Sequence, residues 1–99
     1  MTSLRAHWAA GDETLGFWLS APGVLGAEIT ARQPIDYVCI DTQHGAIDYQ
    51  TSVAMIQAID LVGATPIVRV PWNEQGIIGK TLDAGAHGVI VPMVNTRAQ

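Results

Sequence analysis

Four short apolar runs are spaced along the chain, with polar and glycine-containing segments between them. The runs are rich in β-branched and aromatic residues, which favour strands, so we expect strands near 15–19, 37–41, 66–70 and 88–92. These runs are apolar almost throughout rather than alternating. That pattern is typical of strands covered on both faces of a parallel sheet.

The segments between these runs show a helical period instead. Apolar residues recur at helical spacing over 24–31, 50–62 and 74–84, which predicts three amphipathic helices. Asn73 is the expected N-cap of the third helix. Gly63 and Gly85 follow the second and third helices, where a left-handed C-cap residue would lie.

Alternating strands and helices predict an α/β fold with a parallel sheet and right-handed crossovers, either doubly wound or a barrel. The turn after the first strand, 19–23, lacks the G-x-G-x-x-G spacing of a dinucleotide-binding sheet, so we favour the barrel. A complete barrel takes roughly 250 residues, whereas this chain has 99. We therefore expect residues 1–99 to be a single partial domain, the N-terminal half of a (β/α)8 TIM barrel with about four strands and three helices.

Composition narrows the class of protein. A net charge of −4 with 48% hydrophobic residues is typical of a soluble globular chain, and no apolar stretch reaches the length of a membrane span. The N-terminus lacks the apolar core of a secretory signal, so a cytoplasmic location is expected. The basic residues are few and scattered, which argues against nucleic acid as a partner. The one cysteine, Cys39, is predicted to be a small buried hydrophobe.

Residues able to support chemistry follow three of the predicted strands. Asp41, His44 and Gly45 come at and after the end of the second strand, Arg69 lies near the end of the third, and Trp18 near the end of the first. Parallel α/β folds place their active sites at these carboxyl ends. The sequence thus predicts a site that combines an acid, a potential base, a cation and an aromatic wall.

Each of these residues also has a purely structural interpretation. Asp41 could orient the ring of His44 as a general base, or it could cap the following turn while His44 is a surface loop residue. Arg69 could hold an anionic ligand, or it could form a structural salt bridge, with Asp41 itself as one partner. Trp18 could line a pocket or belong to a core or an interface. Asp41 and His44 are both metal-ligand types, but they lack further partners at a clear spacing, so no complete metal site is expected within this chain.

Several ordered motifs together resemble the HpcH/HpaI aldolase/citrate lyase family. Within that family the chain is most similar to the class II pyruvate aldolases, such as the 4-hydroxy-2-oxoheptanedioate and 2-keto-3-deoxy sugar-acid aldolases. The match spans nearly all of residues 15–95, and the order and separations of its motifs make the resemblance specific. The motifs are Gly16–Leu19, Asp41–Gly45, Val68–Asn73, Leu82–Gly85 and Val91–Val94.

The resemblance implies a carbon–carbon lyase that cleaves a 4-hydroxy-2-oxo acid to pyruvate and an aldehyde. His44 then matches the general base, Arg69 the residue that binds the pyruvate carboxylate and stabilises the enolate, and Asp83 the acid that raises the basicity of His44. Asp41 and Trp18 match supporting or substrate-binding positions. The resemblance also implies a divalent metal ion, Mg, Mn or Co, whose ligands are expected beyond Gln99.

The resemblance further implies a cytoplasmic homo-oligomer that acts on a small 2-oxo acid in aromatic or sugar-acid catabolism. The full-length protein would carry the activity, and the 99-residue chain alone is expected to be inactive. Two alternatives stay open. One is an enzyme like citrate lyase or malyl-CoA lyase that acts on a thioester, and the other is a non-catalytic half-barrel that acts only by association.

Overall fold

The computed structural model describes residues 3–99, and strands and helices alternate along them. The first helix precedes the first strand, and each later helix connects two neighbouring strands. The elements are α1 (Leu4–Ala9), β1 (Gly16–Leu19), α2 (Val24–Ala31), β2 (Tyr37–Asp41), α3 (Tyr49–Leu61), β3 (Thr65–Arg69), α4 (Gln75–Asp83) and β4 (Gly88–Ile90).

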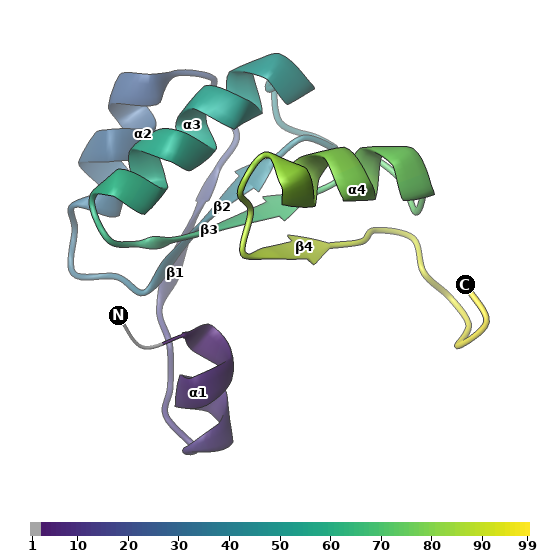
Figure 1. Ribbon diagram of the computed structural model, residues 1–99, viewed down its shortest axis with the longest axis horizontal. Coiled ribbons are helices and arrows are strands. Elements are labelled where there is room, and N and C mark those ends of the chain that lie inside the picture. The colour runs from purple at the N-terminus through teal and green to yellow at the C-terminus, as the bar shows by residue number, and fades with distance from the viewer. Residues whose placement is uncertain (1–2) are drawn as a thin grey trace.

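The four strands form one parallel sheet in the order β1-β2-β3-β4, so every crossover joins adjacent strands. Figure 1 shows α2, α3 and α4 together on one side of this sheet, while α1 lies apart near the start of β1. This sequential winding confirms the predicted α/β class. It is also how the strands of a barrel follow one another, since a doubly wound sheet reverses its strand order at a switch point.

Apolar residues on one face of the sheet pack against α2 and α3 to form the core. Val38, Ile40 and Val68 belong to this cluster and are 0 to 1% exposed. Because successive strand residues point to opposite faces, the neighbours of these residues lie on the face away from the helices. Asp41 and Arg69 therefore reach the inner face, the one that a closed barrel would enclose.

The elements differ from the sequence prediction in three main respects. Helix α1 was not anticipated, and it is only six residues long, which is too short for a period to show. The N-cap of α4 is Glu74, whose carboxylate accepts the N–H groups of Gly76 and Ile77, so the prediction of Asn73 was wrong. Strand β4 ends at Ile90 rather than residue 92, because its partner strand β3 ends opposite it.

Two glycines end helices as predicted. Gly63 and Gly85 have φ angles of 93° and 110°, and they follow the C-cap residues of α3 and α4. Side chains with a Cβ rarely adopt such angles, so glycine suits both turns. Among residues 3–99, no helix is long and apolar enough to span a membrane.

Candidate active site

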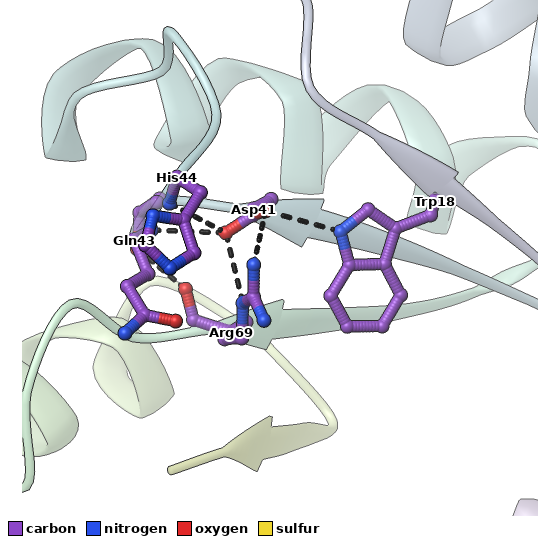
Figure 2. Close-up of polar contacts among 6 residues, drawn as sticks. Trp18, Asp41, Gln43, His44 and Arg69 are labelled. Atoms are coloured by element: carbon purple, nitrogen blue, oxygen red, sulfur yellow. Dashed lines mark hydrogen bonds and ion pairs between the residues drawn. The ribbon is translucent and has the colours of Figure 1, made fainter. Parts of the chain in front are cut away.

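An ion pair joins the carboxyl ends of β2 and β3. Asp41 and Arg69 are register partners in the parallel ladder, which places their side chains next to each other on the inner face. Arg69 Nε donates to Asp41 Oδ1 at 3.0 Å, and Arg69 Nη2 donates to Asp41 Oδ2 at 2.6 Å. Figure 2 draws both contacts as dashed lines between the two side chains. The salt bridge to Asp41 that the sequence left as an alternative is thus the arrangement observed.

Trp18 joins this pair from β1. Its indole Nε1 donates to Asp41 Oδ2 at 3.1 Å, and the guanidinium carbon of Arg69 lies 5.0 Å from the centroid of the indole ring. At that distance the ring face attracts the cation. Trp18 is paired with Cys39, two residues before Asp41, so its side chain lies on the same face of the sheet. The predicted aromatic wall is therefore part of the ion-pair cluster (Figure 2).

Asp41 also shapes the loop that follows β2. Its Oδ1 accepts the backbone N–H groups of Gln43 at 3.0 Å and His44 at 3.1 Å, as a turn cap does. The alternative, a contact between this carboxylate and the imidazole ring of His44, is not among the hydrogen bonds of residues 3–99. The turn-capping interpretation describes Asp41 correctly, and His44 is an exposed loop residue beside the pair.

Two neighbouring residues hold the same loop against the sheet. Thr42 donates to the carbonyl oxygen of Arg69 twice, from its N–H at 3.0 Å and from its hydroxyl at 2.7 Å. At Gly45 a Cβ atom would lie 2.2 Å from the carbonyl oxygen of Asp41. The chain passes so close there that glycine is required. Thr42 could not be singled out from the sequence, because a single threonine after a strand carries no distinctive signal.

The electrostatics of the pair keep both members charged. Burial of Asp41, which is 2% exposed, disfavours its charged form, but the hydrogen bonds from Arg69, Trp18 and two backbone N–H groups hold its pKa well below the usual range. The hydrogen bond to Asp41 raises the pKa of Arg69. Burial raises the pKa of the neighbouring Cys39 thiol to about 11, so that thiol stays protonated and unreactive at neutral pH. Cys39 is thus the buried hydrophobe that was expected.

The arrangement leaves part of Arg69 available for a ligand. A guanidinium group has more N–H donors than one carboxylate can accept, and Asp41 uses those on the Nε and Nη2 side. No hydrogen bond among residues 3–99 uses Nη1, and the Arg69 side chain is 23% exposed. An anion could therefore bind at the Nη1 edge, at the same end of the strands as His44.

Asp83 does not meet the other predicted site residues within this chain. It is the last residue of α4 and precedes β4, so it lies at the starting edge of the sheet, opposite the edge that carries His44. His87 lies at the same starting edge and contacts Asp60 at 3.2 Å. A cavity of about 410 Å³ lies between α1 and the starts of β2, β3 and β4, and it extends along the sheet to Ile90, the register partner of Arg69. Asp41, His44 and Arg69 are not among its lining residues.

No cluster of metal ligands accompanies the pair. Residues 3–99 contain no group of three or more His, Cys, Asp and Glu side chains that could hold an ion. The carboxylate of Asp41 is already occupied by N–H donors. The residues of this part of the chain therefore do not by themselves fit a metal centre.

Comparison with known proteins places this arrangement in a family. The chain is 48% identical over its whole length to a hydroxypyruvate/pyruvate aldolase of Rhizorhabdus wittichii, and it spans 39% of that protein. It is 35% identical over 92 residues to a 4-hydroxy-2-oxo-heptane-1,7-dioate aldolase of Escherichia coli, covering 93% of this chain and 35% of that one. The chain thus spans well under half the length of these relatives.

Solved structures agree with the sequence relatives. A crystal structure of the citrate synthase SbnG superposes with a TM-score of 0.89 at 40% identity, covering 97% of this chain and 39% of that one. A family member from Burkholderia cenocepacia superposes with a TM-score of 0.87 at 34% identity, covering 97% of this chain and 38% of that one. These likenesses confirm the barrel-type α/β fold. Because the family profile itself matches residues 14–99, the chain belongs to the HpcH/HpaI aldolase/citrate lyase family.

Proposed function

We propose that the whole protein, to which this chain contributes the first strand and helix units of a barrel, cleaves a 4-hydroxy-2-oxo acid to pyruvate and an aldehyde. The observation that carries the proposal is the Arg69 guanidinium, held at the strand ends with one edge open and with His44 on the adjacent loop. The aldolase relatives support the same reaction class.

The residues present suit the steps of that reaction. The Nη1 edge of Arg69 would hold an oxygen of the 2-oxo acid and stabilise the enolate as negative charge develops there. The imidazole of His44 would take the proton of the 4-hydroxyl group. The O–H electrons then form the aldehyde carbonyl while the C3–C4 bond breaks, and its electrons form the enolate of pyruvate. A proton added to C3 completes the pyruvate.

A divalent ion, Mg, Mn or Co, belongs to this proposal as a Lewis acid that polarises the 2-oxo group. Its ligands would come from the rest of the protein, because residues 3–99 bring no suitable set together. We also place the protein in the cytoplasm, as a homo-oligomer in the catabolism of aromatic or sugar acids.

The direct test is an assay of the complete protein with 4-hydroxy-2-oxo acids of different lengths, with and without added Mg, Mn or Co. Pyruvate and aldehyde should appear in equal amounts, and only with the metal. Arg69→Lys keeps the positive charge but loses the planar, forked set of N–H donors of the guanidinium. We therefore expect a higher KM and a lower kcat together. Unchanged kinetics in that variant would assign Arg69 to a structural salt bridge alone.

A second candidate function comes from the solved citrate synthase at 40% identity. An enolate held by the same arginine could instead add to the keto carbon of a second oxo acid, or be released from the larger hydroxy acid in the reverse step, as in enzymes like citrate lyase or malyl-CoA lyase. Turnover of a citrate-type or thioester substrate, without cleavage of 4-hydroxy-2-oxo acids, would favour it. A folded complete protein inactive on both classes would favour the third hypothesis, a non-catalytic role through association.

A further inference from the structure

We propose that Asp41 and Trp18 are positioning residues, which fix the guanidinium plane of Arg69 so that its Nη1 edge is presented to an anionic ligand. The proposal rests on the proposed function only in taking that ligand to be the carboxylate or enolate of a 2-oxo acid. The positioning itself follows from the contacts around Asp41.

The first step is that Asp41 has no capacity left for a ligand. Its two oxygens accept five hydrogen bonds, two from Arg69, one from Trp18 and two from the backbone of the following loop. An ionised carboxylate offers about four acceptor sites. Asp41 is also 2% exposed. We therefore assign it neither the role of a proton acceptor nor that of a metal ligand.

The second step concerns what these contacts do to Arg69. A free arginine side chain samples many rotamers, and ordering it on ligand binding costs free energy. Here two of its nitrogens are fixed by Asp41, and the ring of Trp18 lies 5.0 Å from its carbon atom. The guanidinium is held in its plane before any ligand arrives. Preorganisation of this kind raises affinity and transition-state stabilisation.

The third step concerns the net charge of the Asp41–Arg69 pair. Asp41 and Arg69 are both ionised, so the pair carries no net charge toward a ligand. Arg69 then contributes to ligand binding through the orientation of its remaining N–H donors rather than through an excess of positive charge. Loss of direction should therefore weaken binding even when the charge is kept. The indole N–H of Trp18 matters because it fixes the oxygen, Oδ2, to which Nη2 donates.

Trp18→Phe in the complete protein tests this, because it keeps an aromatic ring but removes the N–H. We expect kcat/KM to fall about 5- to 10-fold, the scale of one hydrogen bond, and pyruvate to inhibit correspondingly less well. Trp8→Phe is the matched control. It removes a 3.0 Å indole hydrogen bond to Thr14 on the exposed α1 segment, and it should change neither quantity.

A double-mutant cycle separates positioning from direct contact with the substrate. In the Arg69→Lys background the fork is already lost, so Trp18→Phe should cost less than about 2-fold. An equal loss in both backgrounds would mean that Trp18 acts independently of Arg69, which overturns the proposal. Asp41→Asn should show the same dependence on Arg69 with a larger loss. If it does not fold, Trp18→Phe still decides the question.

The Arg69 Nε–H resonance in NMR spectra gives a readout that needs no activity. This proton should exchange slowly with water in the wild type and at least about 10-fold faster in Trp18→Phe. If the wild type cleaves no substrate, the proposed function fails while this measurement still tests the positioning. If the Nε–H proton of Arg69 exchanges with water at the same rate in Trp18→Phe, the proposal that Trp18 positions Arg69 is overturned, whatever the kinetics show.

Discussion

At the scale of single residues, one buried carboxylate organises the site. Asp41 connects three strands and a loop, because β1 supplies Trp18, β3 supplies Arg69, and the backbone after β2 folds over the same two oxygens. A charge buried without partners is costly, so removing any one partner should affect the others. His44 differs from these residues, because its side chain is exposed and therefore accessible to a substrate.

His44→Ala should lower kcat for aldol cleavage by roughly 100-fold or more, the scale of general base catalysis. Pyruvate should still bind, because Arg69 would hold its carboxylate. The measurement is steady-state cleavage by the complete protein at saturating metal, together with inhibition by pyruvate. His87→Ala is the matched control, since that exposed histidine contacts Asp60 at the other edge of the sheet. Near-normal turnover in His44→Ala would show that another group is the base.

The lowered pKa of Asp41 predicts how stability depends on pH. The pKa of the folded state lies below the unfolded value of about 3.9. The stabilisation is therefore present above that value, and it is lost as pH falls through the folded pKa. Thermal midpoints measured from pH 6 to pH 2 should fall more steeply for the wild type than for Asp41→Asn. Both proteins share all other carboxylates, so equal slopes would contradict the pKa assignment.

At the scale of elements, the β2–α3 loop determines where His44 lies. Gly45→Ala would force a Cβ to within 2.2 Å of the Asp41 carbonyl oxygen, so the loop must move and carry His44 with it. We expect at least about a 10-fold loss of kcat/KM, since small misplacements cost rate steeply. Gly79→Ala is the control, because a Cβ at this helical position meets nothing within 4 Å. It should leave activity unchanged and stabilise α4 by about 0.5–1 kcal/mol. Equal activity in both variants would contradict this view of the loop.

The strands and longer helices could be predicted because each carries a strong local pattern. The contacts of Asp41 are harder to predict from the sequence, because they depend on the register between strands. The pairing with Arg69 was foreseen only as one alternative, and the hydrogen bond from Trp18 crosses 23 residues of sequence to a strand whose register was unknown. Local patterns also fail for short segments. Helix α1 has too few residues to show a period, and the cap of α4 depends on whether Asn73 or Glu74 folds back.

At the scale of the whole molecule, the position of Asp83 requires a second subunit if the residue acts on His44. The two lie at opposite edges of one sheet, so we expect Asp83 to reach the site of a neighbouring copy. The complete His44→Ala and Asp83→Ala proteins should each be nearly inactive. Mixed after subunit exchange, they should regain part of the activity, because some sites would then contain both intact residues. No recovery despite proven exchange would count against a shared site.

The last prediction concerns the 99-residue chain expressed by itself. Strands β1 and β4 are the edges of the sheet, and edges left unpaired promote association. Large apolar side chains are also exposed, including Leu15 at 60%, Trp72 at 64% and Met93 at 66%. We expect this chain to dimerise, aggregate or lack fixed packing, and to release no pyruvate when metal is added. Light scattering, thermal melting and the cleavage assay would measure this. A monodisperse monomer that melts cooperatively would show that the four strands are self-sufficient. Metal-stimulated cleavage by that monomer would show that the metal ligands lie within these 99 residues after all.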